Sequence, residues 1–246
     1  MIAERPEAQI PMPSKRIIVL ANSYKKKPGR CVAGRELGDD GTVGNWIRPI
    51  SDQPEGELLP RHMKLEDGSP LQVLDIVDVP IGDYAKDKTH PEDWRVETSE
   101  AWKRRRKFAA KYLATIEDKP RDLWMDPSTR ADRATTDFLI KLSNHQSLYL
   151  IRPTDFRVEL TNDFNPFEGK NQQKRRACFT YRRQEYSLGL TDPVFIDRYA
   201  TKFPARDKPA ITVRPPYRDQ CLLCVSLTPV FNGYHYKIVA TVLELP

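Results

Sequence analysis

The 246-residue sequence lacks any apolar run approaching the roughly 20 residues that a helix needs to cross a bilayer. Its first stretch, MIAERPEAQIPMPS, also lacks the apolar segment of a signal peptide. These two absences exclude a helical membrane protein and a secreted precursor. We therefore expect a cytoplasmic protein with no membrane partner, in which residues 1–13 form a flexible tail.

Cysteine is scarce, and its four positions do not form a metal-binding pattern. Cys221 and Cys224 make a CxxC, but the pair lies in CLLCVSL, which is typical of a buried strand. Residues three apart on a strand point to opposite faces, and no second CxxC or nearby CxxH completes four ligands. We expect no metal site and predict buried, reduced thiols.

Motifs of the common enzyme classes are absent as well. The four histidines show no HExxH spacing, and there is no P-loop, GxSxG or dinucleotide fingerprint, so we assign no catalytic residue and no cofactor. In THPEDW, Glu92 and Asp93 follow His90 and could form an acid–base group, or the segment could be a solvated loop. Asp75 and Asp78 lie three apart in a strand pattern, so only one can point inward. A salt bridge to an inward arginine explains that acid as well as catalysis does.

Short strand patterns broken by glycine and proline occupy both ends of the chain. The predicted strands are KRIIVLA, RCVAGRE, NWIRPI and LQVLDIVDVPI, and later SLYLIRP, FRVEL, RRACFTY, EYSLGL, CLLCVSL and YHYKIVATVLEL. Between them, SEAWKRRRKFAAKYLATIED predicts a helix with Ser99 as its N-cap. A second helix is predicted to begin at Asp126, and its core stripe consists of Ala134, Phe138 and Leu142.

This pattern indicates a mainly β protein with a helical connector, an α+β arrangement. We predict a first β domain over residues 14–98, a connector over 99–145 and a second β domain over 146–246. Many short strands suit small barrels or sandwiches. The tripeptide IRP ends a strand at Ile47–Pro49 and again at Ile151–Pro153, so an internal duplication is a reasonable hypothesis.

The small excess of positive charge, 40 Lys and Arg against 34 Asp and Glu, matters through its distribution. The stretch Lys25–Arg35 holds five cations, and strand parity then places Trp46 and Arg48 on one face of the following strand. The small residues Ala33 and Gly34 leave space above this sheet. A ligand or a close neighbouring element could fill it.

Two further basic clusters follow. On the predicted helix, Lys103–Lys107 visits every face, so one arginine must point inward to a carboxylate or a phosphate. Lys174–Arg176 leads into a strand that carries Phe179 and Tyr181. Rings flanked by cations are typical of single-strand nucleic-acid binding, but they also occur on any half-exposed strand.

In KRIIVLANSYK, GRCVAGRE, NWIRPIS, LQVLDIVDVP, LYLIRP, FTYRRQEYSLGLTDP and LLCVSLTPVFNGYHYKIVATV, the chain resembles a bacterial family, the dual OB-containing domain. The resemblance covers most of Lys15 to Val242 and implies two OB-like barrels packed as one unit. It also implies a sensor or binding module of bacterial conflict (anti-phage) systems, with nucleic acid or a nucleotide as ligand. The chain departs from the family pattern at THPEDW and WKRRRKF, so the resemblance does not fix the ligand.

We predict a non-catalytic protein that binds single-stranded DNA or RNA. Trp46 and Tyr181 are expected to stack on bases, and the cations to contact phosphates. The alternatives are a nucleotide or small-signal sensor that controls a partner effector, an enzyme on nucleic acid or nucleotides, and a protein–protein adaptor. The predicted contact residues are Lys25, Lys26, Lys27, Arg30, Arg35, Trp46, Arg48, Arg104, Arg105, Arg106, Arg152, Arg175, Arg176 and Tyr181.

Overall fold

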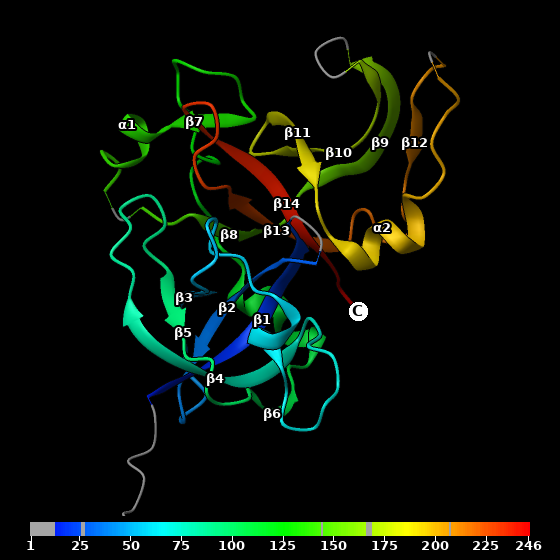
Figure 1. The fold of residues 1–246 in the computed structure, drawn as a ribbon. Coiled ribbons are helices and arrows are strands. Elements are labelled where there is room, and N and C mark those ends of the chain that lie inside the picture. Colours follow the sequence, from blue (N-terminus) through cyan, green and yellow to red (C-terminus); the bar gives the residue numbers. More distant parts are fainter. Residues whose placement is uncertain (1–12, 26–27, 144, 166–168, 207) are drawn as a thin grey trace, which may run out of the picture.

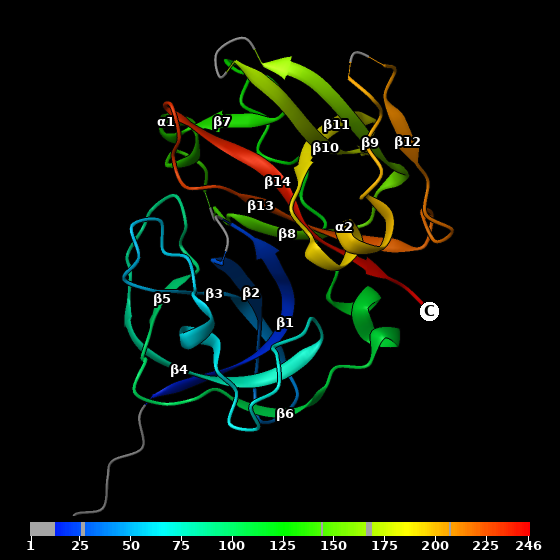
Figure 2. The ribbon, with the colours of Figure 1, turned by 45° about the vertical axis from the view of Figure 1, so that its right-hand side comes forward.

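The computed structural model describes residues 13–25, 28–143, 145–165, 169–206 and 208–246. Residues 1–12 of the predicted tail, and Lys26 and Lys27, lie outside this range. Within it the chain forms two sheets, one below the other in Figures 1 and 2. No helix in the described residues is long and apolar enough to span a membrane.

The first sheet has six strands in the order β1-β2-β3-β5-β4-β6, and β1 also pairs with β4. Five strands therefore close into a barrel, with β3 and β5 parallel and β6 added outside β4. This is the Greek-key barrel form of an OB fold. The elements are β1 Ser14–Tyr24, β2 Arg30–Leu37, β3 Val43–Ile50, a 3-10 helix η1 Pro60–Met63, β4 Asp75–Tyr84, β5 Asp93–Val96 and β6 Lys103–Lys107.

The second sheet repeats this plan in the order β12-β9-β10-β11-β14-β13-β8, with β11 and β14 parallel and β7 paired to β14. Its first strand is broken at Pro153, which has no N–H for the ladder, so β8 pairs with β13 and β9 with β10. The elements are β7 Arg133–Thr135, α1 Thr136–Leu139, β8 Leu148–Ile151, β9 Thr154–Asn165, β10 Lys170–Tyr181, β11 Gln184–Leu190, α2 Pro193–Tyr199, β12 Ile211–Val213, β13 Cys221–Leu227 and β14 Tyr234–Glu244.

A shared apolar cluster joins the two barrels. β1 is apolar without alternation because both of its faces are covered: Ile17 points into the first barrel, whereas Ile18 contacts the shared cluster. In CLLCVSL, Cys221 belongs to the core of the second barrel and Cys224 to the shared cluster, and both thiols are free and buried. The two cysteines point to opposite faces of β13, as the sequence predicted. The barrels form one packed unit.

The connector differs from the helices that the sequence predicted. Lys103–Lys107 is not helical but forms β6, and only Ala110–Ile116 (η2) has helical, 3-10, geometry. Trp102 is the reason, because its side chain is buried in the first barrel and its backbone bonds to Lys64 and Glu66. These bonds hold the chain extended beside β4, where tertiary pairing overrides the helical pattern.

The predicted start of the second helix is also wrong. Asp126 caps a turn, accepting bonds from Ser128 and Thr135, and the four-residue α1 begins after Thr135 instead. The predicted stripe does face the core, since Ala134 is buried in it and Phe138 packs against it. Both ends of the 99–145 stretch contribute strands, β6 to the first sheet and β7 to the second.

Candidate nucleic-acid interface

The predicted platform on β2 and β3 is covered by the rest of the chain. Trp46 is only 2% exposed, and its Nε1–H donates to Asp118 Oδ2 at 3.1 Å. Arg35 donates to the other carboxylate oxygen of Asp118 at 2.9 Å and to the Gly44 carbonyl at 2.7 Å. The predictions that Trp46 stacks on a base and that Arg35 contacts phosphate are therefore wrong. η2 and β8 supply the residues that cover this face, Leu113, Ile116, Leu148 and Leu150 among them.

The alternative of a close neighbouring element explains the small residues on β2. Ala33 packs in the shared cluster between the barrels. A side chain at Gly34 would place its Cβ within 2.9 Å of the backbone of Ile18 on β1. The space above the sheet is filled by protein.

Arg48 is also committed to the interior. Its guanidinium is buried and binds Asp93 in a bidentate pair, at 2.6 and 2.9 Å. Glu92 next to it accepts bonds from the N–H and hydroxyl of Ser147, at 2.6 and 2.8 Å, and burial raises the pKa of this carboxyl. Arg48 is thus no phosphate contact. Of the two acids considered for an enzyme site, Asp93 pairs with Arg48 inside the first barrel, and Glu92 connects the barrels through Ser147.

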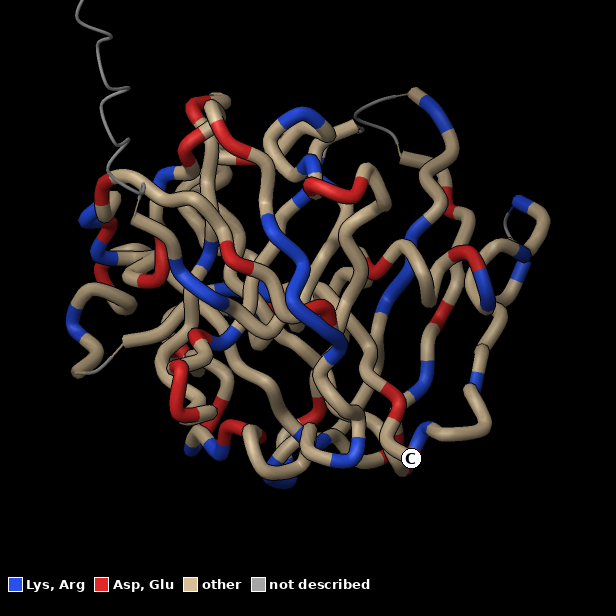
Figure 3. The backbone as a smooth tube through the Cα atoms, turned by 90° about the horizontal axis from the view of Figure 1, so that it is seen from below, with Lys and Arg blue, Asp and Glu red and all other residues tan. Residues whose placement is uncertain are grey.

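The basic run on β6 is matched by acids. Arg104 binds Asp67 at 3.0 Å and the buried Asp75 at 2.9 Å, and Arg105 binds Asp78. In the view of Figure 3, basic and acidic positions are interspersed over the molecule. The salt-bridge interpretation of Asp75 and Asp78 is confirmed, and the prediction that Arg104 contacts phosphate is wrong, because the buried Asp75 holds its guanidinium. Arg105, whose side chain is 42% exposed, and the exposed Arg106 stay predictions.

The other predicted residues are scattered. Tyr181 is buried and donates to the Pro120 carbonyl at 2.8 Å, so it cannot stack on a base. Lys25 pairs with Glu55 at 3.3 Å, and Arg152 pairs with Glu117 at 3.2 Å. The remaining cations lie around the second barrel or where β2 begins: Arg30, Arg175 and Arg176.

A group of rings, of which Phe231 is exposed and the two tyrosines are half-buried, lies on the second barrel among residues that were not predicted as contacts. Arg133 on β7 lies 5.4 Å from the ring of Tyr234 and 4.8 Å from that of Tyr236. Phe231, 65% exposed, is 6.4 Å from Tyr236. We call Arg133, Phe231, Tyr234 and Tyr236 the tyrosine patch. Strand geometry assembles it, because Tyr234 and Tyr236 share a face of β14 and β7 pairs Arg133 opposite Tyr236.

The tyrosine patch reaches the usual nucleic-acid site of an OB barrel through one of its residues, Phe231. Their ligands bind over the second and third strands and the loop between the last two strands. Here those strands are β10 and β11, and the loop is 228–233, which carries Phe231. Arg176 on β10 adjoins the patch through Asp132, which binds Arg133 at 2.9 Å and Arg176 at 3.7 Å.

Part of this site was visible in the sequence. Tyr234 and Tyr236 alternate on a predicted strand, a recognisable sign of rings on one face. The position of Arg133 was not visible, because it depends on a β7–β14 pairing across about a hundred residues of chain.

The comparison with protein families agrees with this architecture. The model of the dual OB-containing domain family matches residues 15–242. Among solved structures, a replication protein A heterotrimer bound to ssDNA is similar at 11% identity with a TM-score of 0.35. That match covers 99% of this chain, which spans about half of the other chain (52%), and at this TM-score no functional assignment follows. No match was found among curated proteins. Because the family model spans nearly the whole sequence, the chain belongs to the dual OB-containing domain family.

Proposed function

We propose that the protein binds single-stranded nucleic acid, without catalysis, through the tyrosine patch of the second barrel. The observation that carries the proposal is the position of Arg133 beside two tyrosine rings, next to an exposed Phe231 in the loop between the last two strands of the barrel. Rings provide stacking surfaces of about 1–3 kcal/mol per base, and arginines follow the phosphates. The second barrel thus has the chemistry that the first barrel buries.

The test is fluorescence anisotropy with labelled single-stranded DNA and RNA. We expect binding at low salt that weakens with a log–log slope of about −0.7 for each phosphate neutralised. The double variant Phe231→Ala/Tyr234→Ala should bind at least about tenfold more weakly, because two stacking surfaces are lost. Arg133→Gln should reduce the salt slope by about one phosphate contact.

The matched control is Tyr112→Ala. Tyr112 is also half exposed and has a cation, Lys111 Nζ, at 5.0 Å from its ring, but it lies on η2 outside both sheets. Its loss should leave affinity unchanged. The proposal fails if no oligonucleotide binds at about 50 mM salt, where such contacts are strong. Equal weakening by the control and the patch variants contradicts it as well.

The proposal extends to the role that the family resemblance implies, a sensor or binding module in a bacterial anti-phage system with a partner effector. In a plaque assay with the native gene neighbourhood, the Phe231→Ala/Tyr234→Ala variant should lose protection that Tyr112→Ala keeps. Protection that survives loss of oligonucleotide binding would separate the two functions and contradict this extension.

A further inference from the structure

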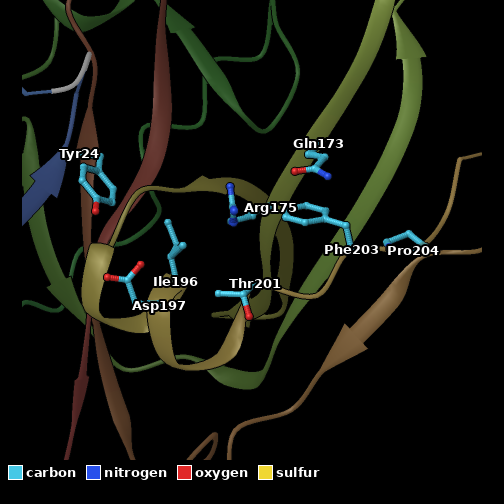
Figure 4. A pocket seen from close by; sticks show the side chains of 8 residues that line it. All are labelled: Tyr24, Gln173, Arg175, Ile196, Asp197, Thr201, Phe203 and Pro204. Carbon is cyan, nitrogen blue, oxygen red and sulfur yellow. The ribbon is translucent and has the colours of Figure 1, made fainter.

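A cavity of about 460 Å³ lies between the barrels, away from every residue of the tyrosine patch. Its walls come from α2 and β10 of the second barrel and from the end of β1 of the first (Figure 4). The volume is in the range of small-molecule sites. Six lining residues carry the argument: Tyr24, Gln173, Arg175, Asp197, Thr201 and Phe203.

Arg175 supplies positive charge to this cavity. Its Nε donates to the Ala200 carbonyl at 2.9 Å, and its guanidinium carbon lies 4.6 Å from the ring centre of Phe203. Among the described residues, no carboxylate oxygen lies within ion-pair distance of its guanidinium. Burial lowers the pKa of Arg175, and the carboxylate of Asp197, which lies beyond ion-pair distance, opposes this effect only in part. An anion bound at the guanidinium would add to that compensation.

Aromatic and polar groups surround the arginine. Figure 4 shows Arg175 on the side of Phe203 that faces Tyr24, across the cavity. Tyr24 is fixed there because its N–H donates to the Thr191 carbonyl of the second barrel at 2.9 Å, and Arg30 lies 4.3 Å from its ring. Rings and a guanidinium plane are surfaces on which a flat heterocycle stacks.

The polar lining suits the edge of a nucleobase. The carboxamide of Gln173 both donates and accepts hydrogen bonds, as does the hydroxyl of Thr201. The carboxylate of Asp197 only accepts, so it favours a base with an exocyclic amine and disfavours a phosphate beside it. The phosphate then belongs at Arg175, on the β10 wall.

From these contacts we infer that the cavity binds a nucleotide, with its phosphate at Arg175 and its base near Asp197, between Tyr24 and the guanidinium plane. The inference goes beyond the proposed function and does not depend on it, since the cavity and the tyrosine patch share no residue. Because Tyr24 belongs to the first barrel, the bound nucleotide contacts both barrels and stabilises their packing.

The experiment measures thermal unfolding and calorimetric binding of the full chain with AMP, GMP, CMP, UMP and inorganic phosphate. A nucleotide with an exocyclic amine, at ten times its dissociation constant, should raise Tm by about 3–6 °C. UMP should bind more weakly, and inorganic phosphate alone should give a smaller shift. Equal shifts with phosphate and nucleotides, or no shift with any of them, would overturn the inference.

Variants locate the site. Arg175→Gln should weaken nucleotide binding at least about tenfold, because a charged hydrogen bond to phosphate is lost. Arg176→Gln is the matched control, since the next residue on β10 points to the opposite face and should bind nucleotide normally. Should Arg175→Gln fail to fold, Gln173→Ala and Asp197→Asn, at partly solvent-exposed positions, replace it. Undiminished nucleotide binding in these variants would also contradict the assignment of the site to this cavity.

The two sites can be distinguished by which binding activity each variant loses. Arg175→Gln should keep the oligonucleotide affinity of the wild type, and Phe231→Ala/Tyr234→Ala should keep its nucleotide affinity. If Arg175→Gln abolishes both bindings and the patch variant neither, the cavity is the oligonucleotide site, and the proposed function fails at the tyrosine patch while the cavity stands.

Discussion

Asp118 shows how one acid can redirect the chemistry of its neighbours. Its Oδ2 accepts from Trp46 at 3.1 Å and from the Leu150 N–H at 2.8 Å, and its Oδ1 accepts from Arg35 at 2.9 Å. The ring and the guanidinium belong to the first barrel, whereas Leu150 belongs to the second. Groups that on a free sheet would meet a ligand therefore meet this carboxylate, which holds the barrels together.

We predict that Asp118→Ala destabilises the protein by about 3–5 kcal/mol, because Arg35 and the Trp46 N–H lose their partner in a mostly buried place. The measurement is the free energy of unfolding in urea. Glu117→Gln is the control, since its partner Arg152 is 39% exposed and such pairs contribute up to about 1 kcal/mol. Equal losses in the two variants would contradict the assignment of Asp118 as the central contact.

At the scale of an element, β6 shows that a run of cations does not specify its own structure. Lys103–Lys107 is compatible with a helix or a strand. The backbone bonds of the buried Trp102 hold the run extended beside β4. Asp75 and Asp78 on β4 then bind Arg104 and Arg105 and stabilise the strand. Asp75 is fully buried, and its carboxylate also accepts from the Gln72 N–H at 2.8 Å. β6 is thus an edge strand whose charges are matched by acids on β4.

We predict that Arg104→Gln lowers the free energy of unfolding by about 2–3 kcal/mol, since the buried Asp75 then keeps only part of its compensation. Arg106→Gln on the same strand should change stability by less than about 0.5 kcal/mol, as an exposed residue does. Chemical denaturation of both variants is the measurement, with oligonucleotide affinity as the second readout, which Arg104→Gln should leave unchanged. A large loss from Arg106→Gln would show that β6 is stabilised in another way.

The strands were predictable from the sequence, but the elements that pack over them were not. KRIIVLA, NWIRPI and CLLCVSL form β1, β3 and β13 as expected, because apolar runs and turn residues are local signals. The IRP tripeptides are not equivalent, since one lies near the end of β3 in the first barrel and the other lies at the break within the first strand of the second barrel, between β8 and β9. Which face of β2 and β3 meets solvent depends on η2 and β8, distant in sequence, and no local pattern encodes that.

At the scale of the whole molecule, the first barrel docks its β2–β3 face against η2 and against β8 of the second barrel. The segment 89–93 completes the docking. His90 Nε2 donates to the Leu227 carbonyl at 3.3 Å, its ring lies 5.4 Å from that of His235, and His145 Nε2 donates to the Thr89 carbonyl at 2.8 Å. Three of the four histidines, scattered in the sequence, therefore meet between the barrels.

These histidines make inter-barrel packing sensitive to acid. Burial lowers the pKa of His90, with Arg48 nearby adding to the effect, and burial also lowers the pKa of His145. As the pH is lowered, the unfolded chain, whose histidine pKa values are about 6.5, binds protons at a higher pH than the folded protein does. The contribution of these histidines to the free energy of unfolding is therefore complete above the pKa of the unfolded chain. It is lost as the pH falls through their lowered pKa values in the folded protein. Glu92 acts in the opposite sense, because burial raises its pKa and its ionisation at higher pH costs stability.

We therefore predict that the free energy of unfolding decreases as the pH is lowered from about 7 to 5, before most carboxylates begin to titrate. The measurement is urea denaturation at each pH. The double variant His90→Gln/His145→Gln should flatten the decrease, and Glu92→Gln should steepen it because the opposing contribution is gone. His62, whose pKa burial also lowers, lies in the first barrel and contributes equally to all three proteins. A decrease that is as steep in the double histidine variant as in the wild type would show that the acid sensitivity arises outside the contact between the barrels.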